Sequence, residues 1–507
     1  MRTAWIGWVA VGILAGSAPN ALAAVSQVQA APQEAAQGDA TVALTYAAAQ
    51  QRVRSNSSLG RAAGYGMQAA RAQADVAAGL NRPTVALDAQ LIRYRKTFDL
   101  SLGDTLDRAQ AELGAAIPGL IADLPGVPGD VLQSVGQRLE AALPEIFVAL
   151  PQDVRLQVDD TTFHPTVTAL QPIYTGGAIP ALRRAAAANV DLAQAKQQEA
   201  VSLEDVNLAR AYFGQVLAAE ALKIARETRD GFDLHLRNAR LLESQGVLSH
   251  AQTLQVEVAR DAAQRQVNRA ELEHDNAVAS LARVVDTNGA VVPTTPLFVN
   301  RDPIGPAGVF LDQASQTNAR LAQAQAGRDL AEAGADLAAS RMKPSVYAFG
   351  IYNLNPDDAL PTEPDWAVGI GARYTLISTV DRRRMLGAAR AQASAAAEVE
   401  RQARDDARLL VTRAYNQAEL ARRQFLSMDS SLEAASENLR VQEVGFREGE
   451  ATAASVVDAR NLLGAARLQR AAAAYEYDLS LAALLAASGS DLTLNDYLQR
   501  EDRISAP

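Results

Sequence analysis

The sequence contains no cysteine among its 507 residues, so the chain can form neither a disulfide bond nor a lipid-modified N-terminal cysteine. Aromatic residues make up only 5% of it, and alanine is abundant, which favours long helices packed through small side chains over a core of large ones. Basic residues are also in deficit. The formal net charge of −10 argues against a nucleic-acid partner and gives no polybasic anchor for an anionic membrane surface.

Beyond the N-terminus, the sequence lacks the uninterrupted run of about 20 apolar residues that a transmembrane helix needs. The N-terminus itself has the three parts of a secretory signal: Arg2, an apolar run at residues 4–15, and small residues at 21–23. The alternative, an N-terminal membrane anchor, is disfavoured because this run is too short to span a bilayer. The sequence therefore predicts a signal peptide at residues 1–23, followed by a linker at 24–37.

Residues that carry chemistry are sparse as well. The four histidines have no metal-ligand spacing with acidic neighbours, and no Gly-rich phosphate loop of Walker or Rossmann form appears. Acidic residues are spread along polar helix faces, where solvation explains them. We therefore expect no active site, no metal and no cofactor, and a protein that is not an enzyme. The histidines are His164, His235, His250 and His274.

What the sequence does contain is a long internal repeat. At an offset of 203 residues it matches itself without a gap from about residue 172 to 285, so that Arg210-Ala211-Tyr212 falls on Arg413-Ala414-Tyr415 and Gly246 on Gly449. A period near 200 residues is far too long for a solenoid and indicates a duplicated half. We place the first structural repeat at residues 38–290, the second at 291–488, and a C-terminal tail at 489–507.

Each half combines short strands with very long helices. Alternating side chains predict strands near residues 84–93, 161–173, 345–353 and 367–377, with aromatic residues at strand ends and interiors. This pattern suits a membrane β-barrel with aromatic girdles, and a soluble sheet is the alternative. These aromatic residues are Tyr94, Phe163, Tyr174, Tyr347, Phe349, Tyr352, Trp366 and Tyr374.

Helical hairpins are expected at residues 178–285 and 380–487, with turns at Gly246 and Gly449. The outgoing helix of the second hairpin has an apolar residue at every seventh position, which calls for a coiled-coil partner. We expect that partner to be the returning helix of the same hairpin. The stripe consists of Val411, Ala418, Phe425, Leu432, Leu439 and Phe446.

One segment breaks the symmetry of the two halves. Residues 98–159 separate the first pair of strands, whereas only residues 354–366 separate the second pair. Spaced apolar residues in this insertion suggest amphipathic helices, which we expect its prolines to break. The favoured interpretation is a decorated loop packed on its own scaffold, and the alternative is a surface module that contacts a ligand, lipopolysaccharide or the channel mouth. The prolines are Pro118, Pro125, Pro128, Pro144 and Pro151.

The duplicated order of strand, long helical hairpin and strand behind a signal peptide resembles the TolC-like outer-membrane efflux protein family. Its more specific residues are Gln171-Pro172-Ile173-Tyr174-Thr175-Gly176-Gly177 and the hairpin returns Gly246-Val247-Leu248-Ser249 and Gly449-Glu450-Ala451-Thr452. The resemblance implies an α+β membrane protein and a homotrimer. Each chain would give four strands to a 12-stranded outer-membrane β-barrel, continuous with a periplasmic α-helical coiled-coil barrel.

The resemblance also implies a function. The chain would be the exit duct of a tripartite efflux system, a channel that passively conducts drugs or other small molecules through the outer membrane of a Gram-negative bacterium. Its partners would be a periplasmic adaptor, an inner-membrane transporter and outer-membrane lipid. One alternative is an exit duct for type I protein or polysaccharide secretion. The other, from a different class, is a non-channel periplasmic coiled-coil scaffold.

Site residues follow from the same resemblance. Family members narrow the periplasmic entrance with two carboxylates three residues apart on the last hairpin. Asp458 matches the second position, and Ser455 occupies the first. In the best-known relatives an arginine, a tyrosine and an aspartate near the turns tie the closed state. The matching positions here are Ala451, Phe446 and Gln252, which cannot form those ties in the same way. The two hairpin returns would contact the adaptor.

Overall fold

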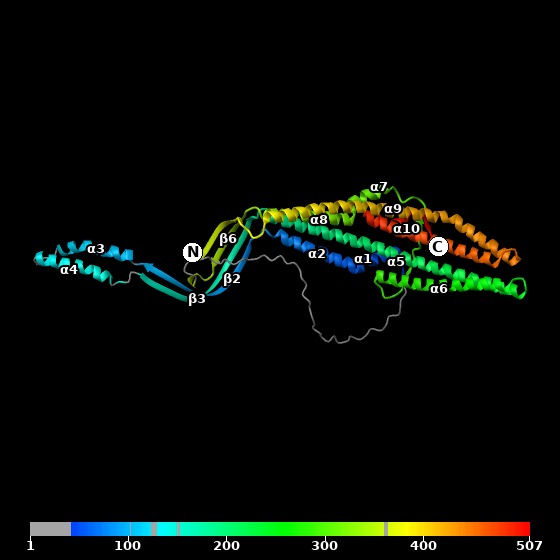
Figure 1. The fold of residues 1–507 in the computed structure, drawn as a ribbon, viewed down its shortest axis with the longest axis horizontal. Helices are drawn as coiled ribbons and strands as arrows, with labels where there is room; N and C mark the ends of the chain where they lie inside the picture. Colours follow the sequence, from blue (N-terminus) through cyan, green and yellow to red (C-terminus); the bar gives the residue numbers. More distant parts are fainter. Residues whose placement is uncertain are drawn as a thin grey trace, which may run out of the picture.

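The computed structural model describes residues 42–101, 103–122, 129–148, 150, 153–358 and 364–506. The signal peptide and linker expected at residues 1–37 lie outside this part of the chain. The described elements are arranged along one long axis, with a pair of helices at one end, a sheet next to it, and a bundle of long helices at the other end (Figure 1). In this part of the chain, every helix is too short or too polar to cross a membrane.

Two helices of 67 residues run the length of the bundle, α5 (Ala178–Ser244) and α9 (Arg382–Glu448). At a rise of 1.5 Å per residue, each is about 100 Å long. Helices α6 (His250–Val285) and α10 (Ala453–Ser488) return along them, and their bounds coincide at the repeat offset of 203 residues. Shorter helices pack alongside: α1 (Tyr46–Asn56), α2 (Ser58–Ala78), α7 (Ala307–Thr317), α8 (Ala319–Ser340) and α11 (Leu494–Leu498).

The apolar stripe predicted on the second long helix lies in the core. Val411, Ala418 and Phe425 are completely buried, and Leu439 and Phe446 are nearly so. They pack against α10, whose buried face consists mostly of alanine together with Tyr477 and several leucines. Small side chains let the two helices approach closely, as the composition indicated.

Short connecting segments cross the middle of the bundle, where β1 (Val42–Leu44) pairs with β4 (Val291–Pro293), and β5 (Phe298–Asn300) with β8 (Arg503–Ser505). The repeated tyrosines hold these segments. The Tyr212 hydroxyl accepts hydrogen bonds from the backbone N–H groups of Thr294 and Thr295, at 3.0 and 2.9 Å. It donates to the carbonyl of Leu44 at 2.7 Å, while the Tyr415 hydroxyl donates to Gly305. The Arg-Ala-Tyr repeat thus marks the crossing points.

Four strands form one antiparallel sheet in the order β2-β3-β6-β7. They are β2 (Thr84–Ser101), β3 (Asp153–Tyr174), β6 (Ser345–Asn353) and β7 (Trp366–Arg373). Strands β2 and β3 are longer than predicted and continue as a two-stranded ribbon. Charged residues pair across this ribbon, as Arg95 does with Asp159 at 2.5 Å. Strand β7 ends four residues early, because its partner begins at Ser345 directly after Pro344, which has no N–H to extend the ladder.

The two faces of the sheet differ. One face carries apolar side chains more than 60% exposed, including Val85, Leu87 and Leu91 on β2 and Val368 and Ile370 on β7. The opposite face carries the buried polar residues Thr162, His164, Thr166 and Asn353.

Two of the aromatic residues expected in a girdle lie on the polar face instead. The rings of Phe349 and Tyr347 cover Gly369 and Gly371, where an added Cβ would come within 2.9 and 2.6 Å of ring atoms. Strand alternation therefore places these two rings on the polar face of the sheet, over the two glycines.

The insertion forms two helices of 20 residues, α3 (Gly103–Ala122) and α4 (Gly129–Val148). Pro118 and Pro144 lie inside these helices, so the expectation that they break them was wrong. A proline inside a helix removes one hydrogen bond at a cost of about 3 kcal/mol, which kinks a helix without always ending it. Pro125, Pro128 and Pro151 lie outside the described residues. The pair extends away from the sheet rather than packing on it, which corrects the favoured interpretation of the insertion (Figure 1).

Candidate functional site at the hairpin tips

The two hairpins end in turns of the same design, which we call the hairpin tips (residues 245–249 and 449–452). Gly246 and Gly449 adopt positive φ angles of 73° and 80°, which suit glycine and let the chain leave each helix. At the first tip, Ser249 caps α6 in a capping box with Gln252. At the second, the Thr452 hydroxyl accepts a hydrogen bond from the Ser455 N–H at 3.1 Å. Both tips are therefore closed turns with defined caps.

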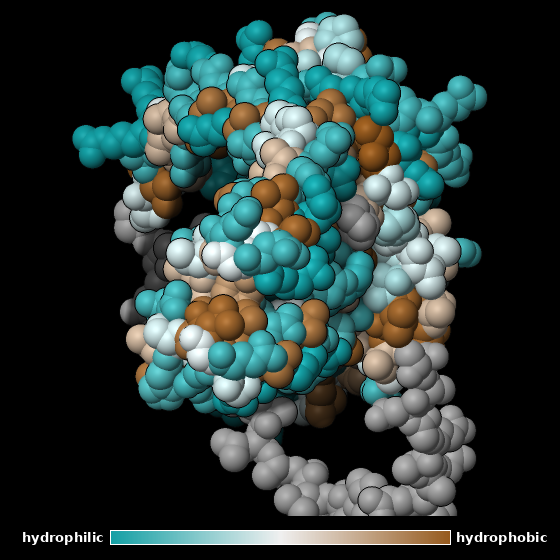
Figure 2. All heavy atoms as spheres, turned by 90° about the vertical axis from the view of Figure 1, so that its right-hand side faces the viewer, coloured by the Kyte–Doolittle hydropathy of each residue, from teal (hydrophilic) through white to brown (hydrophobic). Residues whose placement is uncertain are grey.

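The tips are open to solvent. Val247 is 65% exposed, and the residues from Gly449 to Thr452 are exposed or partly exposed. Viewed from the tip end, the surface is mostly hydrophilic, with apolar residues in separate spots rather than one continuous patch (Figure 2). Leu248 and Ala451 are only partly exposed, because they pack against the buried apolar cluster beneath the tips.

Asp458 and Ser455 lie in the first turns of α10, three residues apart and on neighbouring positions of one helix face. Asp458 is exposed and forms no ion pair with any described residue. Ser455 is partly buried, and its hydroxyl donates to the Thr452 carbonyl at 2.8 Å. Asp458 thus presents a free carboxylate close to the second tip, while Ser455 is engaged in the helix start.

The three positions where relatives have tying residues serve other purposes here. Phe446 is buried and contacts the ring of His235 at a centroid distance of 4.5 Å. Ala451 packs close to Gly445, and Gln252 completes the capping box of α6. Phe446 and Ala451 therefore make apolar contacts, whereas Gln252 makes hydrogen bonds within its own helix cap.

The contacts that join the two hairpins near the tips involve residues that the sequence reasoning missed. Arg460 on α10 forms an ion pair with Glu443 on α9. Its guanidinium lies against α5 at Gly231 and 5.9 Å from the ring centroid of Phe232. Burial and the nearby Arg460 charge lower the pKa of His235, which keeps the imidazole neutral between the helices. We call Arg460, Glu443, Gly231, Phe232 and His235 the cross-hairpin contact.

The repeat contained a signal for this contact. At the offset of 203 residues, Glu443 and Arg460 fall on Arg240 and Glu257, which also form an ion pair, at 3.4 Å. Each hairpin therefore has one ion pair at the same level, with the charges exchanged. A search of the alignment for charge-exchanged pairs would have found it.

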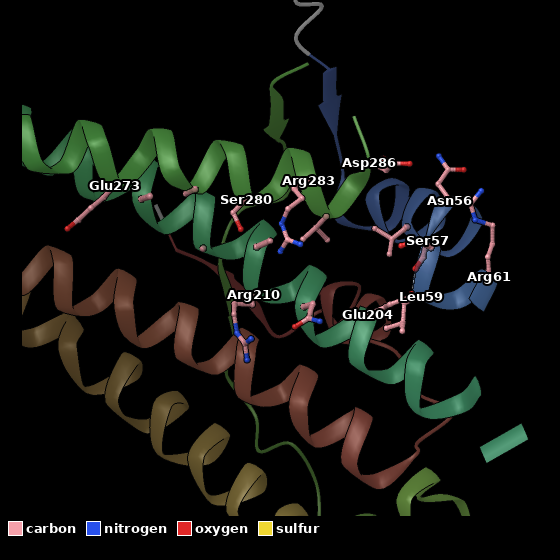
Figure 3. A pocket seen from close by; sticks show the side chains of 18 residues that line it. Asn56, Ser57, Leu59, Arg61, Glu204, Arg210, Glu273, Ser280, Arg283 and Asp286 are labelled. Atoms are coloured by element: carbon pink, nitrogen blue, oxygen red, sulfur yellow. Dashed lines mark hydrogen bonds between the residues drawn. The ribbon is translucent and has the colours of Figure 1, made fainter. Parts of the chain in front are cut away.

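A groove of about 630 Å³ lies farther along the bundle, between α1–α2, α5 and α6. In Figure 3, Arg283 extends from the last turn of α6 over α5, and the Arg210 side chain points down from α5 in this view. The buried Glu204 closes one end, where it contacts the Ser57 hydroxyl and accepts from the Gly60 N–H at 3.0 Å. The groove is thus built from the polar ends of helices and from arginines without carboxylate partners among the described residues.

The histidines lie apart from one another. His250 contacts Glu243 at 2.8 Å beside the first tip, His274 is near Asp275, and His164 lies in the sheet. Within the described ranges, no three His, Cys, Asp or Glu side chains are grouped so that they could hold a metal ion.

Comparison with known proteins places this architecture. Residues 310–490 match the family model described as outer membrane efflux protein. The chain is 28% identical over 273 residues to protein CyaE of Bordetella pertussis, a match that covers 50% of this chain and 56% of that protein. The chain thus spans little more than half the length of this relative.

Solved structures share the fold over most of the chain. The outer-membrane channel OprN superposes with a TM-score of 0.67 and 17% identity over 88% of this chain and 89% of that one. The Campylobacter jejuni CmeC outer membrane channel gives 0.66 and 13% over 90% and 89%. The open state of the Neisseria gonorrhoeae MtrE outer membrane channel gives 0.64 and 16% over 88% and 89%. Residues 310–490 therefore match the outer membrane efflux protein family, and most of the chain shares the fold of solved outer-membrane channels.

Proposed function

We propose that this chain is the exit duct of a tripartite efflux system and passes drugs or other small molecules through the outer membrane without covalent change. The observation that carries the proposal is the four-stranded sheet with one apolar, exposed face and two outer edges, β2 and β7, that pair with no described strand. In lipid every backbone polar group needs a partner, so four strands cannot stand alone. Three copies would close a 12-stranded barrel without an edge.

The height of the apolar face supports a membrane position. Phe163 and Tyr174 are eleven residues apart on β3, and both lie on the apolar face because the register shifts between Pro172 and Tyr174. At about 3.3 Å per residue and a tilt of about 40°, they are roughly 28 Å apart along the barrel axis, close to the 25 Å apolar band of such barrels. Tyr352 and Trp366, which pair across β6 and β7, lie on the same face as Phe163.

The helices would then extend the barrel into the periplasm for about 100 Å, with the hairpin tips at the far end. There the exposed tips would meet a periplasmic adaptor, with an inner-membrane transporter behind it. Asp458 would approach two copies of itself around the three-fold axis and form the anionic ring of the entrance, with Ser455 beside it. A single ring of carboxylates in a narrow pore attracts cations.

A deletion strain tests the cargo. Loss of the gene should raise susceptibility to several small toxic compounds, and plasmid-borne wild type should restore resistance. Unchanged susceptibility, with one or more proteins or a polysaccharide missing from the medium, would contradict the efflux assignment and favour a secretion duct. The complemented strain tests export, because the chain in its outer-membrane fraction should begin after residue 23.

A further inference from the structure

The two halves of the chain show how a half of this kind packs against another. Helix α5 of the first half lies against α8 and α10 of the second half. The corresponding flank of the first half is formed by α2 and α6, since Ser57 and Asn318 cap α2 and α8 and the bounds of α6 and α10 coincide at the repeat offset. In the described part of the chain, no helix packs on the α2–α6 flank as α5 packs on α8 and α10.

This flank contains the groove of Figure 3, and its most prominent charge is Arg283. The side chain is exposed and forms no ion pair with any described residue. On the corresponding flank of α9, Asp405 is also exposed and without an ion pair among the described residues, whereas its neighbour Asp406 accepts from Gln402. Arg283 and Asp405 are thus a cation and a carboxylate on the two flanks that the repeat relates, each without an ion pair among the described residues.

The contact inside the chain gives their register. Ser202 on α5 and Ala486 on α10 line one cavity of about 220 Å³ between the two halves. Moved by 203 residues in opposite directions, Ser202 becomes Asp405 and Ala486 becomes Arg283. We infer that α9 of a neighbouring copy fills the α2–α6 groove and that its Asp405 pairs with Arg283. This inference rests on the proposed trimer and names the residues of its seam.

The contact between α5 and α10 inside the chain also has an ion pair, at a different position along the helices. Arg467 on α10 pairs with Glu227 on α5 at 2.8 Å, and the repeat places Gln264 and Ser430 at the corresponding positions between copies. A wrong assembly in which α5 of one copy entered the outer groove of another would lose both ion pairs. Because the ion pair within a chain and the one proposed between chains lie at different positions along the helices, each groove accepts the matching long helix better than the other one.

Charge exchange in the full-length protein tests the seam. Arg283→Glu should lower the trimer fraction by about tenfold at low salt, because two carboxylates would then face each other. Asp405→Arg in the same chain should restore it. Both side chains are exposed in a single chain, so folding of the protomer should be unaffected. Trimers of Arg283→Glu as stable as wild type, or no restoration in the double variant, would overturn the inference.

Cross-linking gives a second readout, since the natural chain has no cysteine to interfere. With a short bismaleimide, the variant Arg283→Cys/Asp405→Cys should give covalent dimers and trimers. The matched control Ser202→Cys/Ala486→Cys should link only within one chain. Native trimers without links between chains would refute the seam alone. Absence of native trimers in the wild type would instead refute the proposed function.

Discussion

Replacement of Gly231 by alanine should separate the two hairpins near their tips. Gly231 lies within α5, where alanine would ordinarily stabilise the helix by about 1 kcal/mol. Here the added Cβ would overlap the guanidinium of Arg460 and would lie 2.8 Å from its Nε. Arg460 would have to leave, and the pair with Glu443 and the contact with the Phe232 ring would be lost.

The magnitude follows from these contacts. A hydrogen bond between charged groups contributes about 1.5–3 kcal/mol, and we take about 1.5–2 because Glu443 is 40% exposed and partly screened. The contact of Arg460 with the ring adds about 0.5–1 kcal/mol. After the gain in helix propensity, Gly231→Ala should lower the free energy of unfolding by about 1–2 kcal/mol.

A double-mutant cycle makes the test sharp. In an Arg460→Ala background the obstacle is absent, so the same Gly231→Ala substitution should raise the free energy of unfolding by up to about 1 kcal/mol. Chemical unfolding of the detergent-solubilised protein, followed by circular dichroism, gives both values. A matched control is Arg467→Ala, which removes a half-exposed pair between the same two helices and should change the effect of Gly231→Ala very little. Equal signs in the two backgrounds would refute the cross-hairpin contact.

Three further predictions concern the entrance, the core and the insertion. Asp458→Ala should largely remove the cation preference of the channel and its block by a multivalent cation added from the periplasmic side. Single-channel conductance at low salt measures both effects. Equal block in the two proteins would exclude Asp458 from the entrance. Burial raises the pKa of Asp478 well above its usual value, so this carboxyl stays protonated in the folded state at pH values where it ionises in the unfolded state. The free energy of unfolding should therefore fall as the pH rises above about 4, by up to about 1.4 kcal/mol per pH unit, until the raised pKa is passed. Asp478→Asn should remove that slope from the unfolding midpoints, and a slope that persists would assign it to another group. Replacement of residues 102–152 by a short turn should leave trimer assembly intact, since long insertions between strands cost little free energy. In the intact protein, protease should cut this segment only from outside the cell. Loss of trimers, or cleavage from the periplasm only, would contradict this topology.

The long elements could be predicted because their signals are local and repeated. Gly246 and Gly449, 203 residues apart, fixed both hairpin turns, and the seven-residue stripe that ends at Phe446 fixed the partner helix. The ribbon and the insertion were misjudged, because Arg95 stabilises a strand through Asp159 on the other strand, and because Pro118 is tolerated inside a helix. Such effects depend on neighbours that a single segment does not contain.

The candidate site was predictable in its position more than in its contacts. The resemblance directed attention to Asp458, which the structure leaves exposed beside the second tip. His235 and Arg460 could not be foreseen individually, since a histidine or arginine on a helix is usually solvated. Their burial follows from the crossing of α5 with α9 and α10, which only the tertiary structure specifies.

Native mass spectrometry of the protein extracted from outer membranes tests most directly whether this chain forms a membrane duct. A detergent-dependent particle with the mass of three chains is the expected result, because two edges of the sheet pair with no strand in the described part of the chain. Recovery of the protein as a water-soluble single chain, stable without detergent, would contradict the duct and favour a periplasmic scaffold.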